Sequence, residues 1–594
     1  MSANIPSGDF DPEKLNEAVV AASGQCHDML KDFFNTQGNS DAKSSDPIGL
    51  GQAYLDFTAS LMKNPEKLME AQMEAWNAYA NLWTGAANKM LGKETEPGIK
   101  PEKGDRRFKD AAWENNPFFD FIKQSYLLTA NTIESAVAEA EGMDEKAKHK
   151  LQFYTKQFVD AMSPSNFAMT NPEVLEATLA SRGENLVKGM QNFCEDFNME
   201  TGELRIKMSD KSDFELGKNV ATTPGKVVFQ NDLLQLIQYL PEGKEVHAQP
   251  LLIMPPWINK YYILDLQEKN SLIKWLVGQG HTVFVISWVN PDEKLGDKDF
   301  EDYVFEGSLA ALDAVEKATG EKRINVIGYC IGGTLLGATL AYMAAKNDKR
   351  IASATFFVTL MDFSDPGDLG VFIDEEQLQT LEKTMNENGY HDGAAMSKSF
   401  NMLRANDLIW SFYVHNYLLG KDPFPFDLLF WNADSTRMPA KMHSTYLRTM
   451  YLENKFKEPG GMMIGDVAID LRTIKTPSYF ISAQEDHIAP WESTYAGAQL
   501  LSGPVRFVLG KSGHIAGIVN PPAAKKYGYH TGSKVEVGAT EWLEKAKSHD
   551  GSWWPDWNRW VKKYAGDKVP ARTPGDGKLK IVEDAPGSYV RKRY

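Results

Sequence analysis

A cysteine between two glycines has the pattern of a nucleophile elbow. An apolar, β-rich run over Arg323–Ile327 leads into Gly328-Tyr329-Cys330-Ile331-Gly332, and a helical pattern follows. A strand, a sharp turn and a helix in this order expose the central side chain, and the helix N-terminus stabilises a thiolate and offers N–H groups to an oxyanion. Cys330 is therefore a candidate nucleophile. The alternative interpretation is a buried structural thiol beside a tight turn.

The residues that could activate this cysteine follow two later β-rich runs. Asp486 comes shortly after Pro477–Ser482, and His514 comes shortly after Val505–Leu509. A triad built on the carboxyl ends of parallel strands runs along the chain as nucleophile, acid and histidine, and these residues have that order. We therefore predict that Cys330, Asp486 and His514 form a catalytic triad.

Two neighbours of Asp486 are competing assignments. Glu485 and His487 each lie one residue from it, so a shift of the loop by one position would exchange them. Other chemistries have weaker support. His, Cys, Asp and Glu do not occur at metal-ligand spacing, and the glycine-rich segment after Cys330 lacks the Lys-Ser/Thr of a phosphate-binding loop. We predict no metal and no nucleotide-phosphate site.

The loop after the first core strand is the expected source of a second oxyanion donor. The strand is predicted over Pro250–Met254, and Pro255-Pro256-Trp257-Ile258-Asn259 follows it. The backbone N–H of Trp257 or of Ile258, paired with the N–H of Ile331, would complete an oxyanion hole. The alternative is that this loop is rigid and packs under a cap.

The strands and helices that must position these residues begin near residue 220, where the spacing of apolar residues changes. Short apolar runs alternate with helical segments, which is typical of βαβ units around a parallel sheet covered on both faces. The fold class predicted is α/β, an α/β-hydrolase fold with an inserted cap and an N-terminal all-helical domain. Strands are predicted over 250–254, 281–288, 323–328, 351–358, 477–482 and 505–509, and helices over 267–280, 303–319 and 333–346.

The same patterns divide the chain into three segments. Residues 1–45 are rich in Gly, Ser and Asp and are expected to be a flexible extension. Residues 46–210 have helical periodicity and form the predicted helical domain. Residues 211–594 form the predicted catalytic domain, in which the strand pattern is interrupted over about 361–470 by the cap insertion.

Aromatic residues gather in part of that insertion, between Trp410 and Trp431. Such density is typical of core packing. Pro65–Trp83 also has Met, Leu, Tyr and Trp at helical spacing. Core packing is the first interpretation there as well.

Composition excludes several classes of protein. The 64 basic and 80 acidic residues give a net charge of −16, which disfavours nucleic acid as a partner. Three cysteines form no disulfide framework and suit a reducing compartment. The first 14 residues are polar and do not resemble a secretory signal, and no apolar run is long enough for a transmembrane segment. We expect a cytoplasmic location.

A cysteine nucleophile favours one type of reaction. Transfer of an acyl group from a thioester to a thiolate preserves its transfer potential, so acyl transfer to a further acceptor is favoured over ester hydrolysis. The sequence around Cys330 also resembles the class I polyhydroxyalkanoate synthases. The resemblance rests on GYCIGGT at 328–334, PPWINKYYILDL after the first strand, GHIAG at 513–517 and GSWWP at 551–555, and it extends from about Asp105 onward.

The resemblance implies an acyltransferase that polymerises (R)-3-hydroxyacyl-CoA, such as 3-hydroxybutyryl-CoA, and releases CoA. No cofactor is implied, because CoA is the leaving group of the substrate. Cys330 would hold the growing polyester chain, His514 would be the general base, and Asp486 would orient His514 or help to activate the 3-hydroxyl group.

A homodimer at the surface of cytoplasmic polyester granules, in contact with phasins, is also implied. For Trp410–Trp431 the resemblance implies, as the alternative to core packing, a lid whose apolar surface covers the cleft and contacts a second subunit, with Trp431 in that contact. For Pro65–Trp83 the alternative to core packing is contact with a granule or a granule-coating protein.

Two other functions remain open at the level of sequence. A thioesterase or a polyester depolymerase of the same fold would transfer the acyl group to water instead of to a hydroxyacyl chain. A non-catalytic granule-coat protein would fit the helical N-terminal domain, although it would have no need of all three triad residues.

Overall fold

The computed structural model describes Ala53, Asp56, Phe57 and residues 65–91, 98–102, 104–199, 203–210, 213–532 and 535–594. The expected flexible extension over residues 1–45 lies outside this part of the chain. The chain divides into two compact units. One consists of residues up to Asp210 together with Arg404–Phe424, and the other of Lys211–Leu403 and Pro425–Tyr594.

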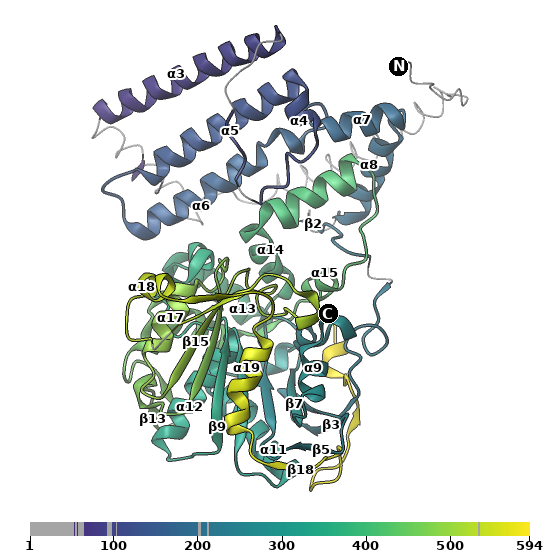
Figure 1. Cartoon of the computed structure of the whole chain (residues 1–594), viewed down its shortest axis with the longest axis vertical. Coiled ribbons are helices and arrows are strands. Elements are labelled where there is room, and N and C mark those ends of the chain that lie inside the picture. Colours follow the sequence, from purple (N-terminus) through teal and green to yellow (C-terminus); the bar gives the residue numbers. More distant parts are fainter. Residues whose placement is uncertain are drawn as a thin grey trace. The chain divides into compact units, whose positions relative to one another are not determined.

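The first unit is helical, and its helices from α3 to α8 have the purple and blue colours of Figure 1. Asparagine or aspartate side chains cap three of its helices by accepting backbone N–H groups: Asn116 before α5, Asp144 before α6 and Asn171 before α7. Its main helices are α3 (Pro65–Met90), α4 (Ala112–Asn115), α5 (Pro117–Ala138), α6 (Glu145–Ala161), α7 (Pro172–Ala180) and α8 (Glu184–Asp196), with a short hairpin β1 (Phe197–Asn198) and β2 (Glu203–Leu204).

A segment distant in sequence belongs to this helical unit. Within Arg404–Phe424, the hydroxyl of Tyr417 donates to Oδ2 of Asp196 at 2.7 Å, and the carbonyl of Leu418 accepts from Nδ2 of Asn185 at 2.8 Å. The segment consists of two π-helical stretches, Asn406–Trp410 and Tyr413–Leu418. Part of the region predicted as one cap insertion therefore packs with the helical unit.

The second unit is built on an eleven-stranded sheet of order β17-β16-β15-β14-β9-β8-β6-β7-β4-β3-β19. Its centre, from β15 to β7, is parallel, and the strands at both edges are antiparallel. The six predicted strands are present within two residues of the predicted bounds: β6 (Leu251–Met254), β7 (Val283–Trp288), β8 (Ile324–Tyr329), β9 (Ile351–Phe357), β14 (Ser478–Ala483) and β15 (Val505–Gly510).

The edge strands were not predicted, because they are short or form antiparallel hairpins without a helical crossover. On one side they are β3 (Gly225–Gln230), β4 (Leu234–Tyr239) and β19 (Glu583–Asp584), and on the other β16 (Tyr529–Thr531) and β17 (Lys547–His549). A separate pair joins β5 (Glu245–His247) to β18 (Lys568–Pro570). The C-terminal region, which looks irregular in sequence, thus contributes to the sheet.

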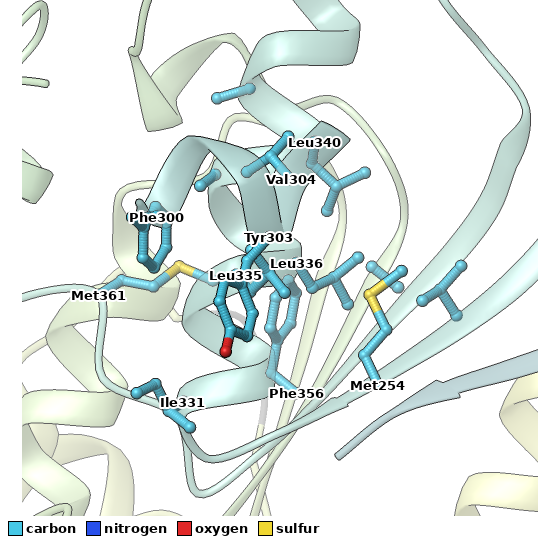
Figure 2. Close-up of a cluster of buried hydrophobic side chains, with 14 of the residues drawn as sticks. Met254, Phe300, Tyr303, Val304, Ile331, Leu335, Leu336, Leu340, Phe356 and Met361 are labelled. Atoms are coloured by element: carbon cyan, nitrogen blue, oxygen red, sulfur yellow. The ribbon is translucent and has the colours of Figure 1, made fainter. Parts of the chain in front are cut away.

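Helices cover both faces of the sheet, as the alternating pattern requires. The hydrophobic cluster on one face includes side chains of α11 (Ala310–Thr319), α12 (Ile331–Ala345), α17 (Trp491–Gln499) and α18 (Ala539–Glu544), and the other includes α9 (Leu272–Gly278) and α19 (Trp554–Val561). Figure 2 shows the first cluster, where Leu335 and Leu336 of α12 pack near Tyr303 and Phe356. This packing fixes α12, the helix that follows Cys330.

Between β9 and β14 the chain leaves the sheet and forms the cap elements of this unit. Of the insertion predicted over about 361–470, Arg404–Phe424 belongs to the helical unit. The cap elements are α13 (Glu375–Asn388), β10 (Tyr390–His391), α14 (Gly393–Leu403), α15 (Asp427–Asn432), β11 (Met438–Pro439), α16 (Ala440–Tyr446), a π-helical stretch Leu447–Leu452, and the hairpin β12 (Met463–Ile464) and β13 (Val467–Ala468).

Candidate active site

Cys330 occupies the tight turn between β8 and α12. Its backbone has φ +52° and ψ −121°, a conformation that is costly for a residue with a side chain. The turn is held by its neighbours, because the N–H of Cys330 donates to the carbonyl of Phe357 at 2.8 Å and its carbonyl accepts from Gly333 at 2.8 Å. The sharp strand-to-helix turn predicted for this cysteine is present.

The glycines on either side make the turn possible because other backbone lies against them. A Cβ atom on Gly332 would lie 2.2 Å from the carbonyl oxygen of Met254 and 2.7 Å from that of Pro255. A Cβ atom on Gly328 would lie 2.5 Å from Cα of Gly333. The first turn of α12 therefore lies directly against the loop that follows β6.

Asp486 and His514 lie together on the loops after β14 and β15. Oδ2 of Asp486 is 2.7 Å from Nδ1 of His514, and their side chains are 0% and 11% exposed. The other oxygen, Oδ1, accepts the backbone N–H groups of Ile488 and Ala489, both at 2.9 Å. The carboxylate is thus fixed on both sides, and Nε2 is the ring nitrogen of His514 that remains available to Cys330.

The electrostatics of His514 reflect this arrangement. Burial alone lowers the pKa of its imidazole, but the charges of Asp486 and Cys330 and side-chain hydrogen bonds to both outweigh burial and raise the pKa from 6.5 to about 10. An imidazolium beside a cysteine stabilises the thiolate, which is the nucleophilic form. The three predicted residues are therefore brought into one interacting group.

The competing residues occupy other positions. The side chain of Glu485 is exposed, and its N–H donates to the carbonyl of Ser512 at 3.0 Å. His487 is half-buried, and its carbonyl accepts from the N–H of Asp368 at 3.1 Å. The carboxylate that contacts His514 belongs to Asp486.

The expected oxyanion donors lie close to the nucleophile. Ile331 is the first residue of α12, where a backbone N–H has no acceptor within the helix. Ile258 lines the same cavity as Cys330, whereas the side chain of Trp257 is 2% exposed and packs on Trp288 and Tyr303. The assignment of Trp257 or Ile258 as second donor stays a prediction.

A largely apolar cavity of about 90 Å³ opens beside Cys330 and His514. Trp431 forms part of its wall, is 5% exposed and donates its indole N–H to the carbonyl of Lys260 at 2.7 Å. This position in the cavity wall does not test the predicted contact of Trp431 with a second subunit, which stays a prediction. The lining residues are Pro256, Ile258, Asn259, Tyr329, Cys330, Met396, Ser397, Phe400, Trp431, Asn432, Ser435, Ile488, His514 and Ile515.

Sequence analysis missed the cavity residues that the cap contributes. Met396, Ser397 and Phe400 belong to α14, and no motif distinguishes them from other helical residues. It also missed Tyr446 and Tyr451, two buried tyrosines whose pKa values are raised first by burial and further by the charge of Cys330. The spacing YLRTMY at 446–451 is the only signal they offer.

The described residues contain neither a cluster of metal-ligating side chains nor a membrane-spanning helix. In that part of the chain, no group of three or more His, Cys, Asp and Glu side chains has an arrangement that could hold a metal ion. Among the described helices, none is both long and apolar enough to cross a membrane.

The fold and the elbow define the class of protein. Residues 250–521 match the family described as alpha/beta hydrolase fold, and residues 104–276 match the one described as Poly-beta-hydroxybutyrate polymerase (PhaC) N-terminus. The parallel sheet, the turn at Cys330 and the helical N-terminal region agree with both matches. The protein is an α/β hydrolase in fold with a helical N-terminal region, and the predicted fold class is confirmed.

Similar proteins define the family more narrowly. The chain is 51% identical to the poly(3-hydroxyalkanoate) polymerase of Methylorubrum extorquens, over 90% of this chain and 88% of that one. It is 50% identical to the polymerase subunit PhaC of Rhizobium meliloti (strain 1021), over 90% and 87%, and 41% identical to that of Cupriavidus necator, over 99% and 96%. The chain belongs to the poly(3-hydroxyalkanoate) polymerase family. The predicted family, and with it the predicted acyltransferase and polymerase class, are confirmed.

Proposed function

We propose that this chain polymerises (R)-3-hydroxyacyl-CoA into a polyester and releases CoA, with Cys330 as the residue that holds the acyl group. The observation that carries the proposal is the group formed by Cys330, His514 and Asp486 at the ends of three parallel strands, in a member of the polymerase family.

The first step is acylation of the cysteine. The thiolate of Cys330 attacks the thioester carbonyl of the substrate, a new C–S bond forms, and the bond to CoA breaks. The proton held by His514 passes to the departing CoA thiolate. Backbone N–H groups of Ile331 and of the loop at Trp257 and Ile258 stabilise the oxyanion that forms during the attack.

The second step elongates the chain. The 3-hydroxyl group of the next hydroxyacyl-CoA attacks the thioester on Cys330, and His514 takes the hydroxyl proton. An ester bond forms, the bond to Cys330 breaks, and the sulfur leaves as thiolate. The extended chain then carries the CoA thioester, which Cys330 attacks again with release of CoA.

The contacts of Asp486 support an orienting role. One carboxylate oxygen contacts His514 and the other accepts two backbone N–H groups, so both are engaged within the protein. A carboxylate fixed in this way holds the imidazole in one tautomer and stabilises its charged form. The Asp486 side chain is also 0% exposed, so a substrate hydroxyl could reach it only if the surrounding loops moved.

The remaining parts of the proposal concern partners and location. CoA is a leaving group, so the reaction requires no cofactor. We propose that the protein works as a homodimer at the surface of polyester granules in the cytoplasm, with phasins as neighbours. The exposed apolar residues of α3, which include Trp76 at 76% and Trp83 at 64% exposure, support a contact of the helical unit with an apolar partner.

The proposal is tested by incubating purified protein with (R)-3-hydroxybutyryl-CoA while thiol release and turbidity are followed together, beside Cys330→Ala. Thiol release with insoluble polymer, both absent in the variant, is the expected result. Thiol release with only free hydroxy acid would instead indicate the thioesterase alternative. Equal activity of Cys330→Ala would contradict the triad.

A further inference from the structure

The loop expected to supply the second oxyanion donor is held by the cap. The hydroxyl of Thr436 is shared between the carbonyls of Trp257 at 2.5 Å and Ile258 at 2.6 Å. Asn259 forms an antiparallel bridge with Ser435. The loop that follows β6 therefore has its position set by residues that come almost two hundred positions later, shortly after α15.

A buried ion pair lies at the end of this loop. Nζ of Lys260 is 2.8 Å from Oδ1 of Asp434, and the two side chains are 3% and 4% exposed. The hydroxyl of Tyr262 donates to Oδ2 of the same carboxylate at 2.9 Å. Burial lowers the pKa of Lys260, and the charge of Asp434 opposes this shift. Because desolvation offsets much of the attraction, such a pair contributes little net stability, and its main effect is on geometry.

The C-terminal residues of the chain complete this group. Nε and Nη2 of Arg593 donate to Oδ1 and Oδ2 of Asp434 at 3.1 and 3.2 Å, a bidentate contact. The carbonyl of Lys592 accepts from Nζ of Lys260 at 3.1 Å. Both partners of the buried pair are therefore also bound by the tail, and the three charged side chains form one cluster.

The tail is fixed to the cap on its other side as well. The guanidinium of Arg437 lies between two aromatic rings, 4.0 Å from the centroid of Tyr390 and 3.9 Å from that of Tyr594. Asn290 accepts from the N–H of Arg437 at 2.9 Å and donates to the carbonyl of Lys592 at 3.3 Å. The tail thus contacts the cap segment and the oxyanion loop together.

We propose that Lys260, Asp434 and Arg593 form a clamp that positions the oxyanion loop, so that the C-terminal tail is part of the catalytic machinery. Arg593 is in this view a positioning residue that acts through Asp434 and Lys260. The inference rests on the proposed function, because it assigns the loop its role in stabilising an oxyanion.

Arg593 is the residue that best separates this role from a role in stability alone. Its side chain is 51% exposed, so its ion pair contributes little to stability, while its two hydrogen bonds restrict the orientation of the Asp434 carboxylate. Asp434→Asn would be a harsher change, since it leaves the buried ammonium of Lys260 without a counterion and can prevent folding.

The experiment compares Arg593→Ala with Arg591→Ala in the full chain. The control, Arg591→Ala, also removes one positive charge from the C-terminal tail. Unlike Arg593, Arg591 is not among the hydrogen-bond donors to Asp434 in the structure. Three quantities are measured: hydrogen exchange of the peptide spanning residues 256–262, kcat and KM for CoA release from (R)-3-hydroxybutyryl-CoA, and the rate at which iodoacetamide alkylates Cys330. Alkylation needs the thiolate but no oxyanion hole.

We expect Arg593→Ala to speed exchange in the loop and to lower kcat by about tenfold, with KM and the alkylation rate within about twofold of those of the unchanged protein. We expect Arg593→Lys to recover part of kcat, because lysine restores the positive charge but not the bidentate contact with Asp434. The clamp is rejected if loop exchange matches that of Arg591→Ala, or if alkylation falls in parallel with kcat. Absence of CoA release by the unchanged protein would contradict the proposed function, and loop exchange would still test the clamp.

Discussion

Oδ2 of Asp486 lies 2.7 Å from Nδ1 of His514, although the residues are 28 positions apart and belong to different loops. The loops follow β14 and β15, two neighbouring parallel strands in direct register. Parallel strands deliver their carboxyl ends to the same edge of a sheet, so the contact follows from topology. The same edge carries Cys330 after β8.

Asp486→Asn is expected to slow acylation and elongation alike, by about a hundredfold or more, because the amide cannot stabilise a charged imidazole. Acylation is measured in the pre-steady state with a single equivalent of substrate, and elongation by steady-state release of CoA. A defect confined to elongation would instead assign Asp486 to activation of the substrate hydroxyl. Asp556→Asn, which changes a carboxylate bound to Arg506, controls for loss of a buried charge.

The raised pKa of His514 makes its contribution to stability depend on pH. The folded-state value of about 10 lies above the ordinary 6.5, so the folded state holds the proton more tightly. This stabilisation is complete below pH 6.5 and is lost as the pH rises through 10. We expect the difference in Tm between the unchanged protein and His514→Gln to shrink between about pH 7 and about pH 10.

His530→Gln is the control for that measurement. Burial lowers the pKa of His530 below 6.5, so this histidine is neutral in the folded and unfolded states over most of this range, from about pH 7.5 upward. The Tm difference for His530→Gln should therefore stay constant there. A constant difference for His514→Gln as well would show that His514 does not carry the raised pKa.

Gly332→Ala is expected to disturb the elbow. The added methyl group would lie 2.2 Å from the carbonyl oxygen of Met254, so α12 or the loop after β6 must move. We expect a loss of about 1–3 kcal/mol in the free energy of unfolding, together with a fall in kcat of about tenfold or more. Denaturant unfolding and CoA release measure the two effects. Gly85→Ala in α3, where nothing lies within 4 Å, should leave both unchanged or add slightly to stability.

Substitutions of Trp431 distinguish its packing in the cavity wall from a contact between subunits. Trp431→Ala is expected to cost about 3–5 kcal/mol of stability, because it opens a buried wall of the cavity. The subunit contact that the family resemblance implies as the alternative to core packing would add weaker dimerisation to this loss. Trp431→Phe keeps a ring but loses the indole N–H that reaches Lys260, and should cost less. Sedimentation velocity over a concentration series measures association, and an unchanged profile for Trp431→Ala would remove this residue from the interface.

Much of the site follows from sequence because its members occupy positions set by local pattern. The apolar runs of β8, β14 and β15 are fully or largely buried strands, and period and composition reveal such strands directly. Gly328 and Gly332 are required by close backbone contacts at one turn, so they lie at fixed distances from Cys330. The chain order of nucleophile, acid and histidine then selects Asp486 and His514.

Other features depend on contacts that sequence patterns do not encode. Arg404–Phe424 has the same helical and aromatic character as the rest of the insertion, yet Tyr417 packs with Asp196 in the helical unit. Met396 and Phe400 resemble any residues of an amphipathic helix, and only the fold places them at Cys330.

The sequence by itself determined the chemistry, because a strained turn, a strand order and a nucleophile each require particular residue types at particular spacings. The tertiary structure alone decided what surrounds that chemistry. The clamp of Lys260, Asp434 and Arg593 joins three segments that lie far apart in the chain. The choice of partner for a buried charge depends on which side chains reach it after folding, and no local pattern records that choice.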